Sequence, residues 1–245
     1  MNRSYRDKKR SQAISAKELS WKTAFHEAGH AAAIYLGNRQ KQLPPVFFQI
    51  HIKRLSDSVS KKNDALSMAS DLWWAKVEGG RLIHTLPSSI EEATVDFSLQ
   101  QKQAYLKAFE ADIVNLLVGP LAEANYIAIR DDEIINARLV HLSSLHNYGG
   151  ASDLKVVEDY LDCFAANCAQ REQKLAELFA VAFDFINEGA NWRAIAALAS
   201  FLLKRKIDVI EYEEVATVLA AHFFPQKRPP SVIRNGARQI TQYQF

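Results

Sequence analysis

The chain has 245 residues, 48% of them hydrophobic, which suffices for one domain with a substantial buried core. Lys and Arg (30) nearly balance Asp and Glu (28), so the net charge of +2 excludes a global field that would attract nucleic acid. The two cysteines form no disulfide framework and no apolar run is long enough to span a membrane, so we expect a soluble protein of a reducing compartment, the cytoplasm.

The chain begins with a polar, basic stretch that has no regular spacing of apolar residues. Residues 1–14 are therefore expected to form a flexible arm, and no apolar segment of the kind found in secretory signals follows them. Residues 15–18 have the pattern of a capping box, S-A-K-E. They predict a helix over residues 16–36 that ends at Gly37.

Within this predicted helix, residues 26–30 read H-E-A-G-H, which fits the pattern H-E-x-x-H. Side chains four positions apart lie on one helix face, so His26 and His30 can both reach one Zn²⁺. Glu27 is turned by about 100° around the helix axis, which places it beside the metal as a general base. Gly29 costs about 1 kcal/mol of helix propensity relative to alanine and suggests a close backbone approach. The alternative is that two ordinary histidines fall four apart by chance, which residue frequencies make rare.

A strand is predicted next, because residues 48–54 alternate apolar and polar side chains after two prolines. His51 shares a strand face with Gln49 and Lys53, so we interpret it as an ordinary exposed histidine rather than a ligand. We predict a short helix over residues 66–76 and a second strand over residues 81–86. The edge of a strand beside a zinc site would suit an extended peptide.

The remaining elements are predicted to be helices. One runs over residues 98–118, is kinked or interrupted at Gly119-Pro120, and continues over residues 121–129 with Glu123. A glycine-rich turn then leads, with Ser152 or Asp153 as the cap, into a helix that extends to about residue 169. The last predicted helices cover residues 171–188 with a stop at Gly189, residues 192–204, and residues 208–224 with Asp208 as the cap. Residues 225–245 are expected to form an extended tail rich in proline and arginine.

Two histidines do not complete a catalytic zinc site, which usually has three protein ligands and one open position. The metzincin pattern requires glycine and histidine where this chain has Ala33 and Leu36, so that class is excluded. Two carboxylates remain open as the third ligand. Glu123 lies within a predicted helix, and Asp153 follows the glycine-rich turn.

Three segments resemble the peptidase domain of the FtsH family, the membrane-bound AAA+ zinc proteases. Residues 25–31 (FHEAGHA) are similar to that family's Y-H-E-A-G-H-A, and residues 150–154 (GASDL) to its T-G-A-S-N-D-L without the Asn. Residues 117–123 (LVGPLAE) resemble its L-G-G-R-x-A-E more loosely. The resemblance covers about residues 18–224, and the stretches at about 54–78 and 130–147 look like insertions relative to the family.

The resemblance implies a role for each matched residue. His26, His30 and Asp153 would bind Zn²⁺, Glu27 would be the general base, and Glu123 would be a carboxylate near the metal without being a ligand. The family's ATPase module has no counterpart here, because the sequence contains no Walker A motif.

We therefore expect residues 15–224 to form a mainly α (α+β) domain, an FtsH peptidase-like helical zincin with a small antiparallel sheet. The expected activity is that of a zinc metalloendopeptidase which cleaves unfolded or flexible polypeptides without ATP. A separate ATPase and self-association are possible partners, and nucleic acid is not expected. The alternative is a non-proteolytic, metal-stabilised module that binds peptides or regulates a partner. Glu27 argues against this alternative, since a purely structural zinc site needs no base.

Overall fold

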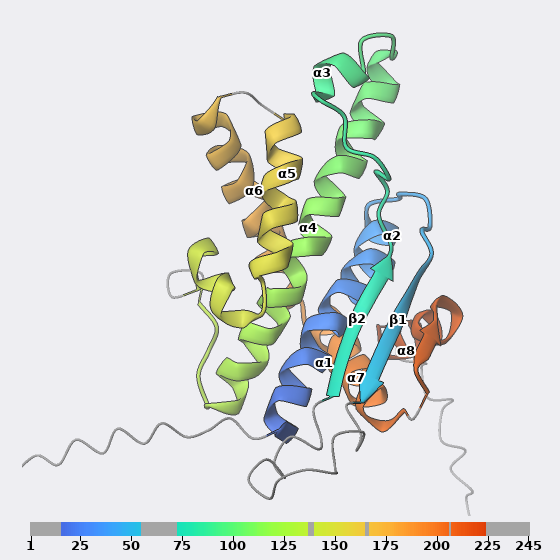
Figure 1. Cartoon of the computed structure of the whole chain (residues 1–245), viewed down its shortest axis with the longest axis vertical. Helices are drawn as coiled ribbons and strands as arrows, with labels where there is room; N and C mark the ends of the chain where they lie inside the picture. The colour runs from blue at the N-terminus through green and yellow to red at the C-terminus, as the bar shows by residue number, and fades with distance from the viewer. Residues whose placement is uncertain (1–15, 55–72, 137–139, 165–166, 206, 224–245) are drawn as a thin grey trace, which may run out of the picture.

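The computed structural model describes residues 16–54, 73–136, 140–164, 167–205 and 207–223. The predicted arm (1–14), the tail (225–245) and the first residue of the predicted capping box, Ser15, lie outside these ranges. The described residues are mostly helical, with a small antiparallel sheet lying against one side of the helices (Figure 1). The expected mainly helical class with a small sheet is thus confirmed.

Helix α1 (Ala16–Ala32) packs against helices α4 and α7 and against strand β2. Its helical course continues through a π-helical turn (Ala33–Gly37) and α2 (Asn38–Gln40), so the predicted stop at Gly37 is wrong. Gly37 keeps right-handed helical angles, with φ −65° and ψ −43°, and does not take up the left-handed conformation of a helix-ending glycine.

Helix α4 (Leu99–Arg130) has 32 residues and therefore runs for about 48 Å. Ser98 and Gln101 form a reciprocal capping box at its start. The predicted interruption at Gly119-Pro120 is wrong, because the helix is continuous through Pro120. The neighbouring residues Leu117 and Leu121 are fully buried, and this packing offsets the backbone hydrogen bond that proline cannot donate.

The sheet consists of β1 (Phe48–Arg54), β2 (Trp73–Gly79) and β3 (Val209–Glu211), in the order β2-β1-β3 with all pairs antiparallel. Strand β1 confirms the prediction. On its outer face, His51 lies 3.5 Å from Glu78 of β2, as expected for an ordinary strand histidine.

Strand β2 corrects two predictions. Residues 73–76 were expected in a helix, but they are extended; residues 66–72 lie outside the described ranges. Ala75 is buried towards the helices, whereas Trp74 and Lys76 on either side of it are exposed, which is the alternation of a strand. Residues 81–86 contain no strand, because the chain leaves β2 through Gly79 and Gly80 with positive φ angles of 89° and 78°.

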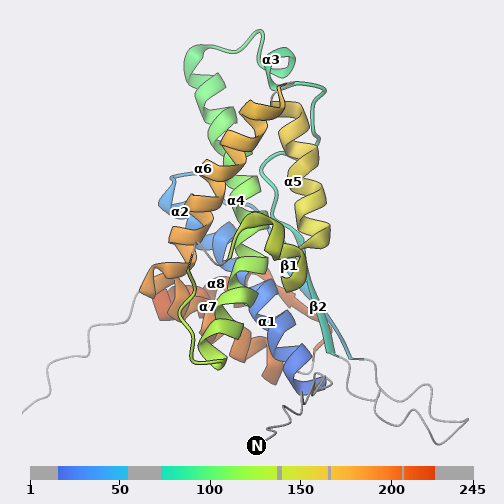
Figure 2. The same cartoon turned by 90° about the vertical axis from the view of Figure 1, so that its left-hand side faces the viewer.

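The other elements follow in chain order. They are α3 (Ile90–Ala93), the 3₁₀ helix η2 (Leu142–Tyr148), α5 (Ala151–Phe164), α6 (Cys168–Asn187), α7 (Gly189–Lys204) and α8 (Tyr212–Phe223). Figure 2 shows α3 at the far tip of the molecule, beside the start of α4, with α5 and α6 packed along α4.

Three predicted boundaries in this part of the chain are wrong. Helix α5 ends at Phe164, and the side chain of Asn167 caps a separate α6 by accepting from Ala169 N at 2.8 Å. Gly189 begins α7 rather than ending α6. Asp208 caps no helix, because the short strand β3 comes before α8.

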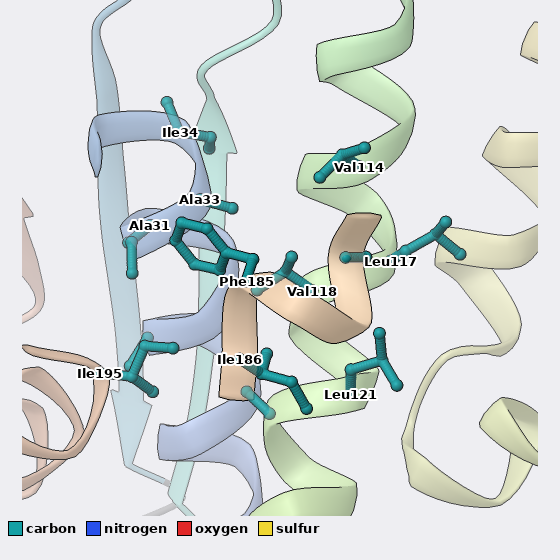
Figure 3. Close-up of a cluster of buried hydrophobic side chains, with 14 of the residues drawn as sticks. Ala31, Ala33, Ile34, Val114, Leu117, Val118, Leu121, Phe185, Ile186 and Ile195 are labelled. Carbon is teal, nitrogen blue, oxygen red and sulfur yellow. The ribbon is translucent and has the colours of Figure 1, made fainter. Parts of the chain in front are cut away.

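The core lies where α1, α4, α6 and α7 meet. In Figure 3, Phe185 and Ile186 of α6 lie among buried side chains of α1, the π-helical turn, α4 and α7. The labelled partners are Ala31, Ala33, Ile34, Val114, Leu117, Val118, Leu121 and Ile195. Apolar burial of this extent fixes the position of α1 relative to α4.

Candidate metal centre

Close packing of α1 on α4 positions the histidines of the H-E-x-x-H segment. A Cβ atom at Gly29 would lie 2.7 Å from Ala122 Cβ and 2.9 Å from the carbonyl oxygen of Val118. Any side chain at this position would push the helices apart. The presence of a glycine with low helix propensity at position 29 is thus explained, as expected, by the close approach of two backbones.

His30 lies directly over the backbone of α4. A Cβ at Gly119 would be only 2.3 Å from His30 Nε2. The Nδ1 atom of His30 donates to the carbonyl oxygen of Asn115 at 2.8 Å. Since a carbonyl can only accept, Nδ1 carries the proton and the lone pair of Nε2 is left for a ligand.

His26 is held in the same way. Its Nδ1 lies 3.3 Å from Glu123 Oε2 and 3.2 Å from the carbonyl oxygen of Tyr148. Both partners accept hydrogen bonds, so Nδ1 carries the proton and Nε2 points away from α4. Gly149 makes this possible, because its φ of 72° turns the chain where a Cβ would lie 3.1 Å from His26 Nδ1.

Asp153 faces both histidines from helix α5. The helix starts at Ala151, so Asp153 lies within its first turn and is not the predicted cap; nor is Ser152. Asp153 Oδ2 is 3.2 Å from His26 Nε2, and Oδ1 is 3.5 Å from His30 Nε2. Of the two carboxylates that the sequence left open, Asp153 meets both Nε2 atoms, whereas Glu123 contacts the opposite edge of the His26 ring.

The three ligand atoms of His26, His30 and Asp153 all lie within 4.8 Å of one another, and the cluster is largely buried. Atoms bound to a tetrahedral Zn²⁺ at 2.0–2.1 Å are about 3.3 Å apart. His26 Nε2 lies 3.2 Å from Oδ2 of Asp153, and His30 Nε2 lies 3.5 Å from Oδ1, the other oxygen of this carboxylate; both separations are close to this value. The residue types and their closeness therefore fit a metal ion with nitrogen and oxygen ligands.

Electrostatics support the same interpretation. Burial lowers the pKa of His26, but hydrogen bonds to Asp153 and Glu123 outweigh it and raise the pKa to about 10. Burial raises the pKa of Asp153, but His30 and His26 outweigh it and hold that pKa well below its usual range. Without metal, the cluster is thus a buried ion pair that holds a proton which a divalent cation would replace.

Glu27 lies between this cluster and the sheet. Its carboxylate accepts from the backbone N–H of Val77 in β2 at 2.7 Å, and it is 9% exposed. Burial raises the pKa of Glu27, and the nearby His26 and His30 offset this in part. A carboxylate with a raised pKa, close to a metal site but outside the ligand set, has the properties of a general base.

The cluster and Glu27 line one cavity of about 950 Å³ that follows the free edge of β2. Among the residues that the structure describes, strand β2 pairs only with β1, and Val77 directs its N–H to the other side, towards Glu27. Because hydrogen-bonding directions alternate along a strand, Ala75 and Gly79 share this free edge with Val77. Two exposed aromatic side chains, Phe47 and Trp74, also line the cavity.

Several groups that shape the site have no signal in the sequence. The carbonyls of Asn115 and Tyr148 and the N–H of Val77 are backbone groups, which any residue could supply. The alternation of Ala75, Lys76, Val77 and Glu78 was the available sign of the edge strand. Gly119 and Gly149 were the available signs that something packs closely at those two positions.

Comparisons of the chain with family models, with curated proteins and with solved structures found no match. The likeness to the FtsH peptidase domain therefore depends on the motifs alone. None of the helices in the part of the chain that the structure describes is both long and apolar enough to cross a bilayer.

Proposed function

We propose that this chain is a zinc-dependent endopeptidase with an FtsH peptidase-like fold. His26, His30 and Asp153 are its zinc ligands, Glu27 is its general base, and Glu123 orients His26. The observation that carries the proposal is the convergence of three ligand atoms beside a buried carboxylate that does not belong to the ligand set. A purely structural zinc site would not need that fourth group.

Zinc, when bound, supplies a Lewis acid that polarises a carbonyl group and makes water nucleophilic near neutral pH. Glu27 accepts the proton of the attacking water at its carboxylate and passes it to the leaving amine. Asn115 and Tyr148, through their carbonyl groups, keep the protons of His30 and His26 on Nδ1, so that both Nε2 atoms remain ligands.

The substrate class follows from the free edge of β2. A peptide lying along the edge of β2 as an added strand could pair with Ala75 and Gly79, on either side of the N–H of Val77 that binds Glu27, and it must be extended over several residues. Folded domains expose few such segments, so the natural substrates are unfolded or flexible polypeptides. A separate ATPase, or self-association of this chain, would be needed to act on folded proteins.

The test is a metal analysis combined with digestion of an unstructured fluorogenic peptide. The zinc-supplemented protein should contain about one Zn²⁺ per chain and cleave the peptide. His26→Ala and His30→Ala should lose the metal. Metal content near zero in the wild type would refute the zinc site. Full zinc occupancy without cleavage of any unfolded substrate would favour the non-proteolytic peptide-binding module instead.

A further inference from the structure

Besides Glu27 and Glu123, one further buried carboxylate lines the cavity of the metal cluster and has no part in the proposed reaction. Asp112 of α4 is 2% exposed. Its Oδ1 accepts from the backbone N–H of Leu82 at 2.9 Å. Its Oδ2 accepts from the N–H of Ile83 at 2.8 Å and from the hydroxyl of Tyr160 at 3.0 Å. We call this arrangement the Asp112 anchor.

The Asp112 anchor holds the segment that immediately follows the edge strand. Residues 81–86 belong to no strand, so the N–H groups of Leu82 and Ile83 have no sheet partner. Buried N–H groups need an acceptor, and Asp112 supplies it from α4. Tyr160, which is fully buried, fixes the carboxylate from α5.

The anchor lies on faces of α4 and α5 that also contribute groups to the metal cluster. Asn115, whose carbonyl group binds His30, lies three residues after Asp112 and thus on the same face of α4. Tyr160 lies seven residues, or two turns, after Asp153 on α5. Asp112 and Tyr160 also line the cavity that contains the cluster. The end of β2 and the histidines are therefore fixed to one common frame.

We propose that Asp112 is a positioning residue, which sets the placement of the free edge of β2 relative to the metal cluster. This inference rests on the proposed peptidase function. A peptide added to β2 presents its scissile carbonyl to the cluster only if the strand edge is correctly placed, and a displacement of about 1 Å can cost 10²-fold in rate. The competing explanation is that Asp112 merely stabilises a loop.

The variant Asp112→Asn separates these explanations, because it keeps the shape but turns one acceptor into an amide donor that faces a backbone N–H. In the zinc-loaded full chain, we expect kcat for an unstructured fluorogenic peptide to fall about 10- to 100-fold. Zinc content should stay unchanged and KM should change less than kcat. Tyr160→Phe keeps both N–H contacts of Asp112 and removes only the contacts of the hydroxyl with Asp112 and with the carbonyl oxygen of Ile83 at 3.4 Å, so it should reduce kcat by a smaller factor.

Val215→Ala is the matched control, because Val215 is fully buried in α8 and does not line the cavity. It should lower the Tm and leave kcat unchanged below the transition. If Asp112→Asn reduces kcat no more than this control does, Asp112 is only a loop anchor and the proposal is wrong.

Hydrogen exchange provides a readout that does not need peptidase activity. Asp112→Asn should accelerate amide exchange at Leu82 and Ile83 and also along residues 75–79, whereas Val215→Ala should not. Acceleration confined to Leu82 and Ile83 would overturn the proposal. Wild-type protein that binds zinc but cleaves nothing would refute the proposed function, and the exchange pattern would still decide whether the anchor positions β2.

Discussion

Two carboxylates flank His26, the buried Glu123 and the half-buried Asp153, and they contact opposite sides of its ring. Asp153 meets Nε2, the atom that faces the cluster, whereas Glu123 meets Nδ1. A group that hydrogen-bonds a ligand imidazole typically changes metal affinity by about 10- to 100-fold. We expect Glu123→Gln to weaken zinc binding within this range and Asp153→Ala to weaken it far more. Competition with a chelator measures both, and the reverse order would make Glu123 the third ligand.

The described hydrogen bond of Glu27 is accepted from the backbone N–H of Val77 and does not involve a ligand atom of the cluster. Glu27→Gln preserves the size of the side chain and removes its ability to take a proton. We expect the variant to keep its zinc and to lose about 10²–10⁴-fold in peptide hydrolysis. Metal analysis and a peptide assay on the same preparation test this. Hydrolysis at the wild-type rate would exclude Glu27 as the base.

The histidine–aspartate pair predicts how the metal-free protein responds to pH. A base whose pKa is higher in the folded than in the unfolded state stabilises the fold while it is protonated. For His26 this contribution is complete below about pH 6.5 and is lost as the pH rises towards about 10. The urea midpoint of the EDTA-treated protein should therefore fall between these values. His26→Gln should show a flatter profile, and an equally steep decline in that variant would contradict the assignment.

At the scale of elements, the contact between α1 and α4 determines whether the site can form. Gly119→Ala would place a methyl group 2.3 Å from His30 Nε2, so the imidazole must move. We expect loss of zinc and a destabilisation of about 1–3 kcal/mol, which is typical of overpacking.

Gly37→Ala is the helical control for this variant. A Cβ at Gly37 would meet only the ring of Phe185, at an ordinary contact distance of 3.6 Å. Alanine at a helical position should stabilise by about 0.5–1 kcal/mol and leave zinc bound. Thermal unfolding with metal analysis measures both variants. Full zinc occupancy in Gly119→Ala would show that His30 is not held as described.

The sequence predicted those elements whose side-chain spacing alone determines their structure. The H-E-x-x-H helix and β1 have clear periods of 3.6 and 2, and both are present. The first half of strand β2 was predicted as helix, because the apolar Trp73-Trp74-Ala75 run obscures its alternation. Strand β3 has three residues and is extended only because it pairs with β1, so its own sequence contains too little signal.

For the candidate site, the sequence indicated residue types but not their arrangement. His26, Glu27 and His30 are adjacent in the chain, and helix geometry alone brings them to one site. That Asp153 rather than Glu123 faces both Nε2 atoms depends on where Gly149 turns the chain, which is a tertiary feature. The role of Asp112 depends on an irregular segment thirty residues away, and no local pattern predicts such a contact.

For the whole molecule, the free edge of β2 and the missing phosphate-binding loop predict which substrates are cut. The sequence contains no G-x-x-x-x-G-K-[ST] motif, so we expect no coupling of ATP hydrolysis to unfolding by this chain alone. A disordered protein should be cleaved and a tightly folded one should survive, because cleavage then requires spontaneous opening of the substrate. Adding ATP should change neither rate. Acceleration by ATP in the pure protein would reveal a nucleotide site.

The distance along the chain between the ligands has a consequence during synthesis. His26 and Asp153 are 127 residues apart, and at 5–20 residues per second a ribosome needs about 6–25 s to add that length. Throughout this interval the growing chain holds the two histidines without the carboxylate of the proposed ligand set. Nascent polypeptides, its own included, are unfolded and close by at that time. For the proposed peptidase, the late translation of α5 means that the site is completed only when α1 and α4 can already be folded together.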